Sequence, residues 1–67
     1  MTELGTYLFK RSINKAEVSR KSGLSRSRMS ELTLNDRSHL RVGELWLIAK
    51  AIDADVHELL DYVCRDL

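Results

Sequence analysis

Cationic and hydroxyl side chains follow one another in a short stretch of the chain and could bind the edges of nucleic-acid bases. Arg26, Ser27 and Arg28 come directly after Ser25, a residue type that commonly begins a helix. A helix whose amino end enters the major groove presents such side chains to base edges, and an arginine can bind guanine O6 and N7 with two donors. We therefore predict base contacts by Arg26 first and Arg28 second, and a contact of Ser27 with a base or a phosphate.

Five further polar residues suit the oxygens of a phosphate backbone. Asn14, Lys15 and Ser25 lie at expected helix starts, where free backbone amides and the positive end of the helix dipole attract anions. Arg37 and Arg41 come from an expected loop and would add positive charge. We predict that these five residues contact phosphates, although any single arginine could also be an ordinary solvated side chain.

Charge is unevenly distributed along the 67 residues, although the net value is only +1. Residues 10–41 hold nine Lys and Arg against three Asp and Glu, a local balance of +6. Residues 42–67 hold two against six, a balance of −4. Such polarity favours one face that meets a polyanion and an opposite end that repels it. We therefore expect double-stranded DNA as a partner, with ordinary solvated faces as the alternative.

Apolar residues recur three and four positions apart and no stretch alternates in twos, so the periodicity predicts one all-α domain over residues 1–67. Helices are expected over residues 3–11, 15–22 and 26–32, followed by a polar loop over residues 33–40. A fourth helix should carry an inward apolar stripe made of Val42, Leu45, Ile48, Ala49 and Ile52. A fifth helix should begin at Asp55 and carry apolar residues as far as Val63.

Residues that commonly begin helices precede four of these segments. Caps are expected at Thr2, Asn14, Ser25 and Asp55. Glu17 and Glu58, three positions after Asn14 and Asp55, complete the spacing of a capping box. Gly23 tolerates the left-handed conformation and should end the second helix. The fourth helix has no such residue at its expected start.

Two short expected helices joined by the turn Gly23-Leu24-Ser25 predict a helix-turn-helix over about residues 15–33. The small residue Ser19 lies where these two helices would approach each other closely. Here the chain resembles the phage-repressor-like helix-turn-helix family, also called the xenobiotic-response-element or Cro type. The likeness is closest in KAEVSRKSGLSRSRMSEL and continues in ELWLIAKAIDADVHELL. It implies a five-helix lambda-repressor-like domain that binds DNA as a repressor or an activator.

The chain also departs from the family pattern. Lys15 and Ser19 stand where the family usually has Gln and Ala, and the loop that holds residues 35–39 is one residue longer than usual. Family members often pair an arginine of the first helix with a glutamate after the third, but Leu8 and Thr33 occupy those positions here. Because both partners are absent together, no unpaired charge is left behind and the fold need not be destabilised.

Large apolar residues near the carboxyl end exceed what one helix can bury. At least one of Trp46 and Leu47 should be exposed in a monomer, because the stripe of the fourth helix cannot cover both. A surface for a second copy would combine Trp46, Leu47, Leu60, Val63 and Leu67. A chain of this size has a small core, so we expect a homodimer, with Trp46 folded over the first helix as the alternative.

Other reactive residue types favour structure over chemistry. A single cysteine, Cys64, cannot form an internal disulfide, and His39 and His57 make no plausible zinc set, so we expect no metal and no cofactor. The sequence contains no nucleophile elbow and no glycine-rich phosphate loop, so we expect no enzyme. No apolar run approaches the ~20 residues of a membrane span and no signal-peptide pattern is present, so we expect a cytoplasmic protein.

These features predict a sequence-specific DNA-binding transcriptional regulator. We expect a repressor that binds a near-palindromic operator as a homodimer, with its third helix in the major groove. The alternative is a protein-interaction module, such as an antitoxin or anti-repressor, whose apolar carboxyl-terminal surface binds another protein. Duplex DNA alone distinguishes the two, because the alternative predicts weak binding to DNA without the partner.

Overall fold

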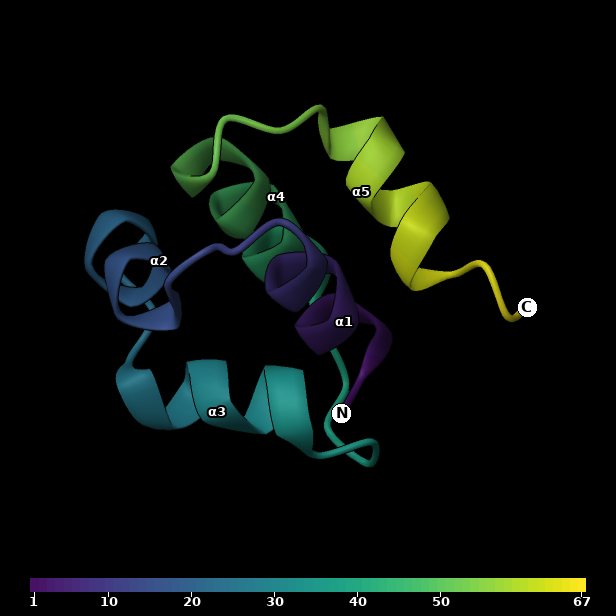
Figure 1. The fold of residues 1–67 in the computed structure, drawn as a ribbon, viewed down its shortest axis with the longest axis horizontal. Coiled ribbons are helices and arrows are strands. Elements are labelled where there is room, and N and C mark those ends of the chain that lie inside the picture. The colour runs from purple at the N-terminus through teal and green to yellow at the C-terminus, as the bar shows by residue number, and fades with distance from the viewer.

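Five α-helices and no strand make up the computed structural model, which describes residues 1–67 (Figure 1). The helices are α1 (Glu3–Lys10), α2 (Lys15–Ser22), α3 (Arg26–Leu34), α4 (Val42–Ala51) and α5 (Val56–Val63). The predicted all-α architecture is therefore confirmed. None of these helices is both long enough and apolar enough to cross a lipid bilayer.

Side-chain hydrogen bonds begin four helices at the residues that the sequence indicates, which are Thr2, Asn14, Ser25 and Asp55. The predicted capping boxes are only half formed. Asn14 accepts from the amide of Glu17, but the Glu17 carboxylate accepts from Arg20 at 2.7 Å. A guanidinium is a stronger donor than a backbone amide, so the carboxylate turns outward. Glu58 likewise makes no return bond to Asp55, whose own side chain accepts from the amides of His57 and Glu58.

The third helix is two residues longer than the sequence predicts, because it continues through Thr33 and Leu34. Thr33 is buried, and its hydroxyl donates to the carbonyl of Met29 at 2.8 Å. That bond satisfies a polar side chain inside the helix without interrupting the backbone ladder. The polar loop therefore begins at Asn35, and it ends at Arg41.

The start of α4 is closed from inside the helix. Glu44 Oε1 accepts from the backbone amide of Arg41 at 3.0 Å. A carboxylate in the first turn of α4 therefore stabilises the start of the helix, where no capping side chain precedes it. Val42 is 84% exposed, which corrects its predicted place in the inward stripe. The inward face of α4 instead holds Leu45, Ile48 and Ala49.

Ten buried apolar side chains form the core, namely Leu4, Tyr7, Leu8, Val18, Met29, Leu32, Leu45, Ile48, Ala49 and Leu59. Helix α1 packs against α3 and α5, and α4 packs against α2 and α5. In Figure 1, α2 and α3 lie at the left and bottom, whereas α5 lies at the upper right. The helix-turn-helix and the last helix therefore lie on opposite sides of α1 and α4.

Helices α1 and α3 approach closely at a glycine. A Cβ atom added to Gly5 would overlap the carbonyl oxygen of Thr33. Thr2 reinforces this contact, because its amide donates to the Thr33 carbonyl at 2.9 Å and its hydroxyl donates to the Leu32 carbonyl at 2.6 Å. Leu8 and Thr33 stand where the family that the sequence resembles often has an Arg–Glu pair, and both are buried here. A small residue at position 5 is thus required for α3 to lie in place.

We predict that Gly5→Ala destabilises the protein although alanine favours helices. The added methyl group overlaps the side chain of Met1, which can move aside, and the backbone carbonyl of Thr33, which cannot, so α1 and α3 must separate at a cost of about 1–3 kcal/mol. Gly43→Ala is the matched control, because Gly43 also lies in a helix and nothing stands within 4 Å of its added Cβ. That control should gain up to about 1 kcal/mol from helix propensity. Urea unfolding followed by circular dichroism measures both, and equal shifts in the two variants would contradict the close approach.

Candidate nucleic-acid interface

A helix-turn-helix is formed by α2, a turn and α3. Gly23 adopts the left-handed conformation with φ of 82°, which ends α2 as predicted. The Ser19 hydroxyl donates to the carbonyl of Leu24 at 2.5 Å and so ties the turn to the helix before it. Val18 and Met29 bury the facing sides of α2 and α3. These contacts orient the amino end of α3 relative to α2.

The open face of α3 carries Arg26, Ser27 and Ser30, all of them exposed. Arg26 makes no ion pair, so its guanidinium is available to a ligand. Lys15 of α2 lies beside this face, because Lys15, Arg26 and Ser30 line one shallow hollow of about 120 Å³. Ser30 is not among the contact residues predicted from the sequence. Its spacing could have indicated it, since residues three and four apart share one helix face.

The side chains at the helix starts already use some of their hydrogen-bonding atoms as helix caps. Asn14 Oδ1 accepts from the amides of Ala16 and Glu17, which leaves the amide nitrogen of its side chain free. Ser25 Oγ accepts from the amide of Arg28 at 3.0 Å, and its hydroxyl hydrogen remains available. Lys15 Nζ lies 3.4 Å from the Thr33 hydroxyl.

Arg28 does not lie with Arg26. Residues two apart on an α-helix point about 200° from each other, so the two arginines leave α3 on different sides. The Arg28 guanidinium donates to Glu44 Oε2 at 2.7 Å and to Glu44 Oε1 at 2.9 Å, and its side chain is only 23% exposed. A further bond reaches the carboxylate of Glu31 at 3.3 Å. The expected base contact by Arg28 stays a prediction, and in the free chain all three nitrogens of its guanidinium are bound within the protein.

The pairing of Arg28 with Glu44 changes the acidity of both groups. The hydrogen bond from Arg28 lowers the pKa of Glu44, and the backbone amide of Arg41 lowers it further, against the opposing effect of burial. The hydrogen bond to Glu44 raises the pKa of Arg28 in return. Both groups are therefore held in their charged forms.

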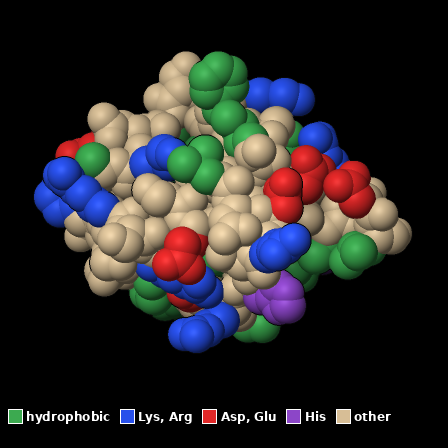
Figure 2. All heavy atoms as spheres, turned by 90° about the horizontal axis from the view of Figure 1, so that it is seen from below, with side chains coloured by type: hydrophobic (Ala, Val, Ile, Leu, Met, Phe, Trp, Pro, Cys, Tyr) green, Lys and Arg blue, Asp and Glu red, His purple; other side chains and the backbone are tan.

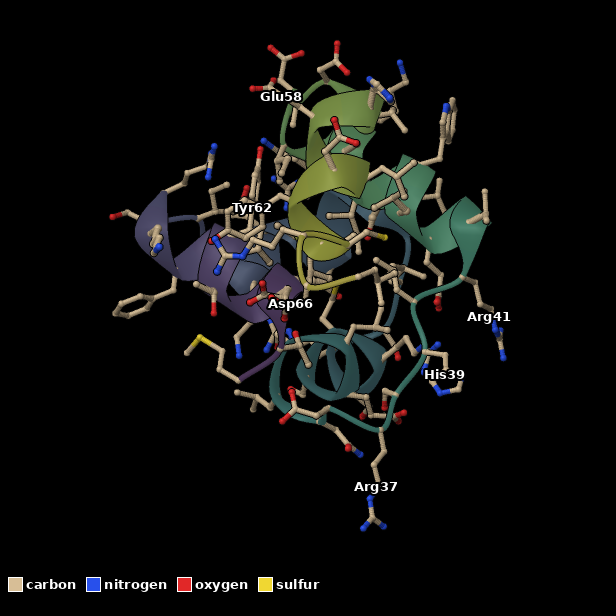
Figure 3. The ribbon with its side chains drawn as sticks, turned by 90° about the vertical axis from the view of Figure 1, so that its right-hand side faces the viewer. Arg37, His39, Arg41, Glu58, Tyr62 and Asp66 are labelled. Atoms are coloured by element: carbon tan, nitrogen blue, oxygen red, sulfur yellow. The ribbon has the colours of Figure 1, made fainter.

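The loop between α3 and α4 contributes the remaining cationic candidates. Arg37 and Arg41 are exposed and have no ion-pair partner. In Figure 3, Arg37 extends at the end of the molecule where α3 lies, Arg41 extends sideways, and Glu58 lies at the opposite end. Figure 2, a view from the α3 side, shows Lys and Arg spread over this face, with several acidic side chains toward the right. This face therefore carries both cationic and acidic side chains, and Arg37 and Glu58 mark opposite ends of the molecule.

The helix-turn-helix is exposed, and an unpaired arginine lies at the start of its second helix. This arrangement indicates a nucleic-acid ligand. A comparison with protein families identifies the family. The model of the Cro/C1-type HTH DNA-binding domain matches residues 3–65. The chain belongs to this family. A Cro/C1-type domain is a DNA-binding module, so the chain is a DNA-binding regulator, and the family is typically not enzymatic. A search of curated proteins and a search of solved structures each found no match.

The residues expected to form a surface for a second copy belong to α4, α5 and the carboxyl end, and two of them share a groove with Leu32 of α3 and with the loop after it. Leu60 and Val63 of this Cro/C1-type domain line a groove of about 360 Å³, together with the exposed Val42 and the half-buried Cys64. Trp46 lies one turn after Val42 on α4 and is 51% exposed, so the expectation that Trp46 or Leu47 is exposed is confirmed for the monomer. Leu47, Leu60 and Leu67 are exposed as well. Val42 was missed because its spacing placed it in the inward stripe.

We predict that acid destabilises the protein partly through Glu44. Its pKa in the folded state lies below the unfolded value of about 4.3, so its stabilisation is complete above that pH and is lost as pH falls through the folded pKa. Glu44→Gln should lower the free energy of unfolding at neutral pH and make its decline toward about pH 3 shallower than in the wild type. Urea unfolding at a series of pH values measures both.

Glu17→Gln is the control for this measurement. The pKa of Glu17 is also lowered, chiefly by its hydrogen bond from Arg20, but both side chains of that pair are more than half exposed. Solvent screens such a pair, so the control should change the pH dependence less. An unchanged pH dependence in Glu44→Gln would contradict the contribution of Glu44.

Proposed function

We propose that the chain is a sequence-specific transcriptional regulator that places α3 in the major groove of duplex DNA. The unpaired guanidinium of Arg26 at the amino end of α3 carries this proposal, because it is exposed beside Ser27 and Ser30. Arg26 would bind the O6 and N7 atoms of a guanine, and the two serines suit base edges or phosphates. Residues 1–67 would act together as one DNA-binding unit.

Phosphate contacts would hold α3 in register with the bases. Asn14, Lys15 and Ser25 stand at the starts of α2 and α3, where backbone amides favour anions. Arg37 would reach the backbone from the same side as α3, and Arg41 would reach it from an adjoining edge. The acidic carboxyl-terminal half, whose Glu58 lies at the far end in Figure 3, would face away from the DNA.

Two copies would bind together as a homodimer and recognise a near-palindromic operator. Support comes from the groove that α4, α5, α1 and the loop line, which includes Val42, Leu60 and Val63, and from the exposed apolar side chains of Trp46, Leu47 and Leu67. A two-fold axis through this surface would place two α3 helices on half-sites about 34 Å apart. Occupation of such a site within a promoter would block transcription, which is the action of a repressor.

The same apolar surface favours a second candidate function. A protein-interaction module, such as an antitoxin or anti-repressor, would use the groove and Trp46 to bind another protein, with DNA contacts secondary. The candidate predicts weak binding to duplex DNA by the isolated chain.

We predict different effects on DNA binding for two arginine substitutions. Arg26→Ala should relax the preference for one base pair and cost about 1–3 kcal/mol on the preferred sequence. Arg37→Ala should weaken binding to all sequences alike and reduce the dependence of log affinity on log salt by about one unit. Selection from a random duplex pool, followed by titration at several salt concentrations, measures both. Identical effects of the two substitutions would refute the assigned roles.

We also predict that Trp46→Ala weakens self-association. Buried aromatic residues often dominate interfaces, so the dissociation constant of the dimer should rise about tenfold or more. Phe9→Ala is the matched control, because Phe9 is 73% exposed and lines a different hollow beside α1. Sedimentation equilibrium measures both variants. A wild-type chain that stays monomeric at high concentration would exclude the homodimer and favour the protein-interaction module.

A further inference from the structure

One guanidinium, that of Arg28, connects α3 with the loop after it and with α4. Arg28 leaves the first turn of α3, binds the Glu44 carboxylate of α4 through Nε and Nη2, and donates from Nη2 to the carbonyl of His39 at 2.9 Å. Its Nη1 donates to Glu31. A planar fork of donors suits this arrangement, because it can bind a carboxylate with two bonds and still reach a neighbouring carbonyl.

Glu44 completes the connection on the side of α4. The same Oε1 atom that accepts from Arg28 also accepts from the backbone amide of Arg41. The Glu44 side chain is only 10% exposed, so water competes weakly for these bonds. The carboxylate therefore holds both the guanidinium and the last residue of the loop.

The loop itself has few other attachments. Within residues 36–40, the amides of Arg37 and Ser38 bond only to Asn35, at the start of the same loop. Leu40 packs partly against the core. The bond from Arg28 to the His39 carbonyl is the one hydrogen bond that ties residues 36–40 to a segment outside the loop. The position of Arg37, two residues before His39, therefore depends on Arg28.

We propose that Arg28 is a positioning residue that holds the loop Asn35–Arg41 at a set place beside the exposed face of α3. It sets the distance between the base-binding side chain of Arg26 and the phosphate-binding side chain of Arg37. The consequence for DNA binding rests on the proposed function, whereas the placement of the loop does not. Arg28 would thus contribute to the DNA interface through its bonds to Glu44 and His39 and not through a contact with DNA.

Amide hydrogen exchange on the free protein tests the placement. Arg28→Lys keeps the charge but cannot bind Glu44 and His39 together, and Glu44→Gln removes the carboxylate and keeps its shape. In both variants the amides of Ser38 and Arg41 should exchange about tenfold faster relative to the core amides of α1 and α5, which report global stability. Unchanged relative exchange of these loop amides in both variants would overturn the proposal.

A double-mutant cycle on the full chain tests the consequence for DNA. Arg37→Ala should weaken binding about tenfold in the wild type but less than about threefold in the Arg28→Lys background, since a released loop no longer holds Arg37 at a phosphate. Equal losses in the two backgrounds would overturn the role of Arg28 in setting the contact. Measurements are made at a temperature where circular dichroism shows every variant folded.

Arg65→Lys is the matched control. Arg65 also donates two bonds to a glutamate distant in sequence, Glu3, but this pair makes no hydrogen bond or ion pair with the loop. It should change neither the exchange of Ser38 and Arg41 nor the loss caused by Arg37→Ala. If the wild-type chain binds no duplex DNA, the proposed function fails, and the exchange of the loop amides still decides whether Arg28 positions the loop.

Discussion

Ten buried apolar side chains hold five short helices together, and every exposed residue assigned to DNA depends on that core for its position. A core of this size leaves little excess stability, so directional bonds at the helix ends carry much of the specificity of the arrangement. Thr2 shows the principle, because it begins α1 and also donates to two carbonyls at the end of α3. The glycine at position 5 then lets the two helices meet, and α3 is held at its carboxyl end by backbone contact.

The amino end of α3 is held by charge. Arg26 and Arg28 are the same residue type only two positions apart, yet they have different surroundings because a helix turns by about 100° per residue. Arg26 points to solvent with no partner, whereas Arg28 meets the carboxylate of Glu44. This contrast matters for recognition, since a free guanidinium can bind a base and a paired one maintains the geometry of the surface around it. The family to which the chain belongs often uses another Arg–Glu pair, and Leu8 and Thr33 stand there instead.

The distribution of charge and apolar surface gives the molecule two different ends. In Figure 3, Arg37 of the loop lies at one end of the molecule and Glu58 of α5 at the other, with Asp66 of the last segment between them. The apolar groove lies between α4, α5, the start of α1 and the loop that follows α3. Arg41 lines this groove and is also one of the proposed phosphate contacts, so a partner in the groove would lie next to the loop that adjoins the DNA.

The sequence by itself determined the five helices, four of their caps, the Gly23 turn and the exposure of Arg26, because these follow from short-range periodicity and local hydrogen bonding. It did not determine that α3 continues through Thr33 or that Val42 faces solvent, since neighbouring helices decide which side of a segment is buried. Only the tertiary structure brought Glu44 to Arg28 across sixteen positions. No local pattern encodes that contact, because it forms only when helices distant in sequence pack together, and it engages within the protein an arginine that the sequence suggested for a base.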